Sequence, residues 1–163
     1  KSNPLDRIPV MELDDGSHIA ESIAICRFFE GQQPEPPLFG TDKKDKAEVE
    51  MWNRRMEAEN LGNATLCFRH THSYREGRIP QVPEFGELCR KNIMERMAWL
   101  DAELADREFI AGECFTVADI TAFTGFQVGR IPKIRIGEDM TNLQRWFDGV
   151  SARPSAQGEF GNM

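Results

Sequence analysis

The first thirty residues alternate between short apolar runs and polar breaks. Apolar runs at residues 8–13 and 17–20 flank the dipeptide Asp15-Gly16. Asp-Gly between two strand-like runs favours a tight hairpin turn with positive φ at both central residues. The period of the pattern then changes, and we expect a short helix that begins at Glu21 and Ser22 and ends near residue 30. Its apolar residues are Ile23, Ile25, Cys26, Phe28 and Phe29.

Residues 31–40 predict a linker. Three prolines lie in this stretch between Gly31 and Gly40. Proline lacks a backbone N–H and cannot continue a helix, so we expect a boundary here between a small N-terminal unit and the rest of the chain.

From residue 42 onward the pattern predicts helices. Apolar residues recur at helical spacing over residues 42–74 and 83–107, and later over 117–128 and 142–153. Residues 109–112 predict a short extended link, and residues 129–136 an irregular segment. The helix at 117–128 is mostly apolar and is expected to form the core of this part. Residues expected to face inward are Val49, Met51, Trp52, Met56, Leu61, Leu66 and Phe68 in the first helix, and Leu88, Ile93, Met97, Trp99, Leu100 and Leu104 in the second.

The segment at residues 115–120 has the spacing of a helix start. With Thr116 as N-cap, Asp119 falls at the third helical position and can return a hydrogen bond to the backbone of the cap. Phe115 and Ile120 then occupy the two positions of a hydrophobic staple. We expect this motif to be structural, so that Asp119→Ala damages folding before chemistry.

Composition and charge narrow the classes of function. The 163 residues are 40% hydrophobic and 29% charged, as in ordinary globular proteins. The net charge of −7 argues against non-specific binding to nucleic acid or to anionic membranes. No apolar run approaches the roughly 18 residues that span a bilayer.

The four cysteines indicate a reducing, cytoplasmic setting. Cys26, Cys67, Cys89 and Cys114 are widely separated, and no C-x-x-C pair occurs. Their spacing fits neither a disulfide framework nor a zinc site.

The entrance of the first helix is a candidate binding site. The N-terminus of a helix offers unpaired N–H groups and a partial positive charge, which can hold a carboxylate. The hydroxyl of Ser22 can add a donor, and the carboxylate of Glu21 can accept from an ammonium group. The pair could therefore grip the end of an α-amino acid. The alternative is that Ser22 only caps the helix and Glu21 lies in solvent.

These residues also resemble a known family. Ile8-Pro9-Val10, the Asp15-Gly16 turn and the stretch from Glu21 to Ile25 are similar to the glutathione-binding half of a cytosolic, bacterial-type glutathione transferase. The capping motif at Thr116 and Asp119, Trp146-Phe147 and Arg153-Pro154-Ser155 also match that family, so the resemblance covers essentially the whole chain.

The resemblance implies an α+β fold in three parts. Residues 1–30 would be the C-terminal part of a thioredoxin-like glutathione-binding domain, consisting of a β-hairpin plus a helix. Residues 31–40 would be a linker, and residues 41–163 an all-α helical bundle of the glutathione transferase C-terminal type. A lone hairpin with one helix is marginal in water, so we expect about 45 to 55 further residues of the thioredoxin-like domain upstream of Lys1.

The resemblance also implies the residues that bind glutathione. Ile8, followed by a cis Pro9, would present its backbone to the cysteinyl part. Glu21 and Ser22 would hold the γ-glutamyl end, and Arg7 could reach the glycyl carboxylate. The Tyr, Ser or Cys that activates the sulfur in this family is expected upstream of Lys1. No catalytic residue is therefore assigned, and the fragment alone is expected to be inactive.

The end of the first long helix carries candidates for the co-substrate pocket. In the resembling family this helix lines that pocket, and Arg69, His70, His72 and Tyr74 could donate hydrogen bonds there. The alternative for each is a solvated polar position near a helix end. His70 and His72 are two residues apart and point in different directions on a helix, so no metal site is expected.

The implied activity is conjugation of the glutathione thiolate to an electrophilic small molecule, as in detoxification. The implied assembly is a homodimer, with Trp52, Arg55 and Glu59 as interface candidates. Alternatives are a glutathione-dependent isomerase or dehalogenase on the same fold, or a non-enzymatic interaction module. Glutathione would be the co-substrate, and neither a metal, a nucleic acid nor a membrane is expected as a partner.

Overall fold

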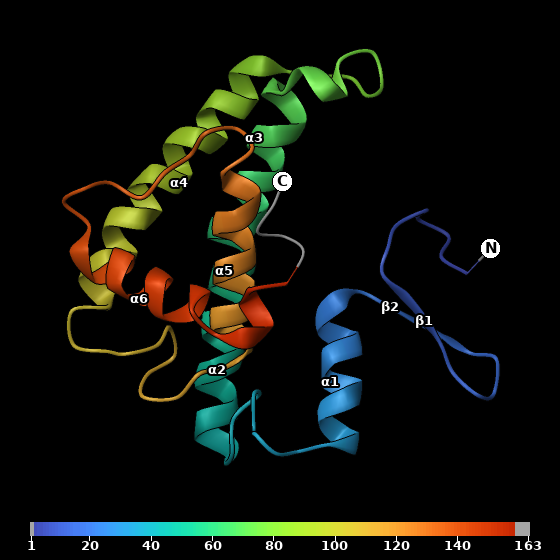
Figure 1. Ribbon diagram of the computed structural model, residues 1–163. Coiled ribbons are helices and arrows are strands. Elements are labelled where there is room, and N and C mark those ends of the chain that lie inside the picture. Colours follow the sequence, from blue (N-terminus) through green and yellow to red (C-terminus); the bar gives the residue numbers. More distant parts are fainter. Residues whose placement is uncertain (1, 159–163) are drawn as a thin grey trace.

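The computed structural model describes residues 2–158 and contains a hairpin with one helix, followed by a helical bundle (Figure 1). This is the predicted fold class. None of the helices in the described range has both the length and the apolar character needed to cross a membrane. The elements are β1 (Val10–Glu12), β2 (His18–Ala20), α1 (Ser22–Gln32), α2 (Lys43–Arg55), the π-helical η1 (Met56–Gly62), α3 (Asn63–Thr71), the short 3₁₀-helix η2 (Ser73–Arg75), α4 (Pro83–Glu103), α5 (Val117–Gly129), α6 (Thr141–Ser151) and η3 (Pro154–Ala156).

The hairpin forms as predicted, but its turn differs. Strands β1 and β2 pair antiparallel with Val10 opposite Ala20. The loop spans three residues: the N–H of Gly16 donates to the carbonyl of Leu13 at 2.9 Å, and only Gly16 of the Asp-Gly pair has positive φ, at +80°. The expected positive φ at Asp15 was wrong, because its carboxylate accepts from the N–H of Ser17 at 2.9 Å and stabilises an ordinary turn before the glycine.

The segment after α1 is anchored to the bundle. Helix α1 ends at Gln32, two residues later than expected, and the carboxylate of Glu30 accepts from the backbone N–H groups of Leu38 and Phe39. Phe39 is buried against Val49 and Val117. The first residue of α5 also donates its N–H to the carbonyl of Leu38 at 2.9 Å. The end of the linker at Leu38 and Phe39 is thus tied to α1 through its backbone and to the helical core through the side chain of Phe39.

The first long helix of the bundle is interrupted. Asp42 caps α2 by accepting from the N–H groups of Lys44 and Asp45, as expected of its first residue. Elements α2, η1 and α3 then follow one another without a break, with a π-helical stretch in the middle. The helix ends at Thr71 rather than Tyr74, because the side-chain amide of Gln81 donates to the carbonyls of Arg69 and His72 and closes the helix there.

The core lies between α3, α4, α5 and α6, and α5 runs through the middle of the bundle (Figure 1). Two residues expected inside are not. Met51 is 40% exposed and Leu88 is 51% exposed. The buried positions of α4 follow each other at intervals of three or four residues, and Leu88 lies beside that stripe. Fully buried large side chains of the core include Met56, Ile93, Leu104, Ile110 and Leu143.

Two boundaries after α4 differ from expectation. The helix ends at Glu103, not at residue 107, and the guanidinium of Arg107 folds back to donate to the carbonyl of Glu103 at 2.9 Å. Residues 109–112 form a tight turn instead of an extended link. Phe109 and Gly112 exchange backbone hydrogen bonds at 2.9 and 3.2 Å.

The predicted capping box at the start of α5 is present. Thr116 is the N-cap, and its N–H and hydroxyl both donate to the carboxylate of Asp119. The predicted staple is not formed in the expected way: Ile120 is 39% exposed, and Phe115 packs edge-on against Phe109 instead. Burial raises the pKa of Asp119, whose carboxylate also accepts from Ile110 and Trp146.

Candidate functional site

The residues before β1 leave one peptide free to meet a ligand. The Ile8-Pro9 peptide bond is cis, as the resemblance implies. The side chain of Ile8 is 94% exposed, and within residues 2–158 its backbone N–H and carbonyl have no hydrogen-bond partner. The side-chain amide of the buried Asn3 donates to the carbonyl of Arg7 at 2.9 Å and holds this loop in place.

The entrance of α1 carries no internal cap. Glu21 is the N-cap residue, with a φ of 72°, and its side chain makes no capping bond. Ser22 is therefore the first residue of the helix, so the alternative is wrong in having Ser22 cap α1, whereas its other half, Glu21 in solvent, agrees with the structure. Both side chains are exposed, and neither has a hydrogen-bond partner within the described part of the chain. The first-turn N–H groups of α1 remain available to an anion.

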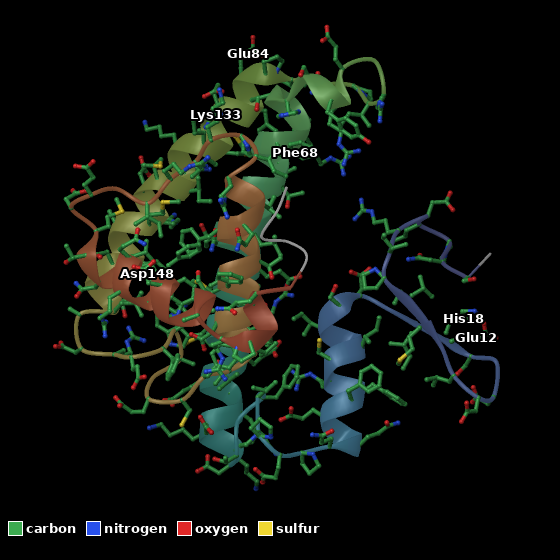
Figure 2. The ribbon with its side chains drawn as sticks, viewed as in Figure 1. Glu12, His18, Phe68, Glu84, Lys133 and Asp148 are labelled. Carbon is green, nitrogen blue, oxygen red and sulfur yellow. The ribbon has the colours of Figure 1, made fainter. Side chains whose placement is uncertain are left out.

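The hairpin register brings these two features to one end. Val10 pairs with Ala20, so Pro9 and Glu21, the next residue outward on each strand, lie at the same end of the hairpin. Glu12 and His18 mark the opposite end, where the Glu12 carboxylate and His18 Nε2 lie 3.8 Å apart (Figure 2). Arg7 is exposed beside Ile8. The five residues predicted to bind glutathione thus surround one end of a two-stranded ribbon.

The histidines at the end of α3 hold the loop that precedes α4. His70 Nδ1 accepts from the N–H of Val82 at 3.1 Å, and His72 Nδ1 accepts from the N–H of Tyr74 at 3.2 Å. Each ring therefore carries its proton on Nε2, which is left to donate outward. Tyr74 is 55% exposed, and no side chain within residues 2–158 pairs with the guanidinium of Arg69.

Sequence reasoning missed three neighbours of these residues. Phe68, labelled on α3 in Figure 2, together with Arg75 and Arg78, joins His72 and Tyr74 in a group that we call the tip cluster. The guanidinium carbon of Arg75 lies 5.2 Å from the ring centre of Phe68, and that of Arg78 lies 4.1 Å from the ring centre of Tyr74. The signal in the sequence was an aromatic residue, Tyr74, followed closely by two arginines after a helix end.

The three residues predicted to form a dimer interface, Trp52, Arg55 and Glu59, already make contacts within the chain. Trp52 is buried and stacks on Trp99 with 5.5 Å between ring centres. The guanidinium carbon of Arg55 lies over Trp52, 4.8 Å from its ring centre, and Glu59 forms an ion pair with Arg96 at 2.9 Å.

An open hollow of about 490 Å³ lies at the linker, and none of the residues predicted to bind glutathione lines it. Among residues 2–158, no group of three or more His, Cys, Asp or Glu side chains is placed to hold a metal ion. The hairpin end and the tip cluster are therefore the two candidate sites.

One protein-family model matches the helical part of the chain. The profile described as "Glutathione S-transferase, C-terminal domain" matches residues 64–154, more than half of the chain.

Curated relatives extend the likeness to both parts of the chain. Glutathione S-transferase 2 of Saccharomyces cerevisiae is 32% identical over 92% of this chain and 65% of its own length. Elongation factor 1-gamma 2 of Oryza sativa subsp. japonica is 26% identical over 100% of this chain and 38% of its own. The chain spans less than two thirds of the length of either relative.

Solved structures share the fold. Gtt2 from Saccharomyces cerevisiae has a TM-score of 0.90 and 31% identity, covering 95% of this chain and 76% of its own. A glutathione S-transferase from Methylobacterium radiotolerans, solved in complex with glutathione sulfonate, has a TM-score of 0.74 and 27% identity, covering 95% of this chain and 72% of its own.

Proposed function

Because this chain belongs to the glutathione S-transferase family, we propose that it binds glutathione as the co-substrate of a transferase that conjugates the thiolate to an electrophilic small molecule. The observation that carries the proposal is the hairpin end, where a cis Ile8-Pro9 peptide and the uncapped entrance of α1 lie together.

Each part of glutathione, which is a tripeptide, has a complementary group at the hairpin end. The α-carboxylate of the γ-glutamyl end would accept from the Ser22 hydroxyl and the first N–H groups of α1, and its ammonium would donate to Glu21. The free N–H and carbonyl of Ile8 would pair with the cysteinyl backbone. Arg7 would meet the glycyl carboxylate with its planar guanidinium, which suits a carboxylate in two-point contact.

The chemistry needs a thiolate. A free cysteine thiol has a pKa of about 8.5, and only the deprotonated sulfur attacks efficiently. In the conjugation the sulfur lone pair forms a bond to carbon, the electrophile releases a leaving group with its bonding pair or moves the pair of a double bond away, and the thiol proton leaves for a base or solvent. Within this chain the role of the described residues is to bind and orient glutathione, and we assign none of them to sulfur activation.

The wider organisation belongs to the same proposal. Residues 1–30 would act as the glutathione-binding unit, residues 31–40 as the linker and residues 41–163 as the helical domain. Arg69, His70, His72 and Tyr74 would face the electrophile, and Arg55 and Glu59 would contribute to a homodimer. Conjugation of this kind serves detoxification in the cytoplasm, and it requires neither a metal nor a nucleic acid.

A second candidate is a non-enzymatic interaction module. It is favoured by the likeness to Elongation factor 1-gamma 2, which covers the whole chain and whose name refers to translation elongation, not to glutathione transfer.

Retention on immobilised glutathione tests the proposal. We expect the chain to be retained and eluted by free glutathione. Ser22→Ala is expected to weaken retention about five- to tenfold, because one charge-assisted hydrogen bond contributes about 1.5 kcal/mol or less at an exposed site. Ser155→Ala, an exposed serine outside the hairpin unit, serves as the matched control and should bind like the unmodified chain. A folded chain that passes through the resin, or a Ser22→Ala variant that binds normally, would contradict the proposed site.

A further inference from the structure

The tip cluster concentrates positive charge on aromatic rings. Arg75 lies over two rings, with its guanidinium carbon 5.2 Å from the centre of Phe68 and 5.6 Å from that of Tyr74. Arg78 approaches the same Tyr74 ring to 4.1 Å. Two cations therefore share one ring, and the ring of His72 lies 5.1 Å from Phe68.

Neither Arg75 nor Arg78 is paired with a carboxylate in the described part of the chain, and the buried Nε of Arg75 has no hydrogen-bond partner there. Residues 69–78 hold three arginines and one glutamate in a chain whose net charge is −7. A local excess of cations that repel one another attracts an anion from solution.

The geometry also selects the shape of that anion. A guanidinium carries its N–H donors in a planar fork, which suits a carboxylate or sulfonate in two-point contact. Tyr74, which is 55% exposed, and the half-buried Phe68 provide aromatic area beside those donors. A ligand that satisfies both has an anionic group attached to an aromatic ring.

We propose that the tip cluster binds the electrophilic co-substrate, and that this co-substrate is a planar aromatic anion, namely an aryl carboxylate or aryl sulfonate. Recognition of an aromatic anion stands on the tip cluster alone, whereas its role as co-substrate rests on the proposed function. In the view of Figure 1, the turn that follows α3 and the hairpin unit lie on the same side of α5.

The test compares two ligands that differ only in charge. Binding of 4-chloro-3-nitrobenzoate and of the neutral 4-chloro-3-nitrobenzamide to the chain is measured by isothermal titration calorimetry without glutathione. We expect the benzoate to bind at least about ten times more tightly, because hydrogen bonds to charged groups contribute about 1.5 kcal/mol or more each.

The double variant Arg75→Met/Arg78→Met keeps the aliphatic stems and removes both charges. It should lose the preference for benzoate and bind the benzamide within about twofold of the original affinity. Arg153→Met is the matched control, because Arg153 also lies on an aromatic ring, 3.8 Å from the centre of Phe115, but outside the tip cluster. If circular dichroism shows that the double variant is unfolded, the exposed Arg78→Met alone provides the comparison, with an expected loss of at least about threefold for benzoate.

Equal affinity for the two ligands, or a preference that survives removal of the arginines in a folded variant, would overturn the proposal. Retention on immobilised glutathione distinguishes failure of the aromatic-anion site from failure of the proposed transferase function. A chain that prefers benzoate but fails to bind glutathione keeps the aromatic-anion site and loses the transferase assignment. A chain that binds glutathione but shows no benzoate preference keeps the transferase assignment alone.

Discussion

At the scale of single residues, Asp119 connects three segments that are far apart in the chain. Its carboxylate accepts from the N–H of Ile110 at 2.9 Å, from the indole N–H of Trp146 at 2.8 Å, and from the N–H and hydroxyl of Thr116. The sequence predicted only the bonds to Thr116, because a capping box is a local spacing. The bonds to Ile110 and Trp146 depend on how the chain folds back, which no local pattern contains.

Asp119→Ala should destabilise the protein strongly. The substitution leaves four donors without an acceptor in a fully buried site, and we expect a loss of at least about 3 kcal/mol in the free energy of unfolding. Urea denaturation followed by circular dichroism measures it. Asp148→Ala, on the exposed face of α6 (Figure 2), is the control and should change stability by less than about 0.5 kcal/mol. A folded Asp119→Ala variant of unchanged stability would show that the network contributes little.

For the residues predicted to bind glutathione, their identity could be predicted from the sequence but their backbone geometry could not. Their identity came from a family resemblance, and the hairpin register then placed Pro9 and Glu21 at one end. The free backbone of Ile8 and the absent cap at Glu21 are properties of the fold. The arginines of the tip cluster were missed, because their sequence positions fall in a loop for which no period exists.

At the scale of elements, the π-helical stretch η1 departs from the regular helix that the sequence predicted. Asn60 inserts its side chain toward α5, where its amide donates to the carbonyl of Ala122 at 2.9 Å and fills the space above Gly125. The amide of Asn63 donates to the carbonyls of Ala58 and Glu59 and satisfies groups that the wider turn releases. An apolar pattern of roughly helical period is nearly the same for α- and π-helical turns, so it could not reveal the change.

Gly125→Ala tests this close approach. A methyl group at this position would lie 2.8 Å from the side chain of Asn60, which is buried and held by its hydrogen bond. We expect a loss of about 1 to 3 kcal/mol in thermal or urea unfolding, as for other overpacked cores.

Gly149→Ala, in contrast to Gly125→Ala, is expected to stabilise the protein. Gly149 lies inside α6 with no atom within 4 Å of the added methyl group. Replacing a helical glycine by alanine without a clash should stabilise by about 0.5 to 1 kcal/mol. If both variants are stabilised alike, Asn60 does not hold η1 against α5.

At the scale of the whole molecule, the four thiols divide by burial. Cys26 and Cys114 are exposed, whereas Cys67 and Cys89 lie in the core between α3 and α4. Burial raises the pKa of the Cys67 and Cys89 thiols and keeps them protonated. The sequence predicted free thiols, three of them among apolar neighbours in helical segments, but only Cys67 and Cys89 are buried.

Alkylation should follow this division. We expect two thiols to react quickly with iodoacetamide in the native chain and all four in urea, with mass spectrometry identifying the sites. The variant Cys26→Ser/Cys114→Ser should lose the fast reaction entirely, because a buried protonated thiol is a poor nucleophile. Fast labelling of Cys67 would mean that α3 and α4 separate readily in solution.

The carboxylate of Glu30 accepts hydrogen bonds from the N–H groups of Leu38 and Phe39 and so closes the bend formed by residues 31–37. Contacts that join the hairpin unit to the bundle are made on either side of this bend: Phe39 packs against Val49 and Val117, and Arg27 of α1 pairs with Glu50 of α2. Insertions of variable length can therefore accumulate in that bend during evolution while the two halves keep their mutual alignment.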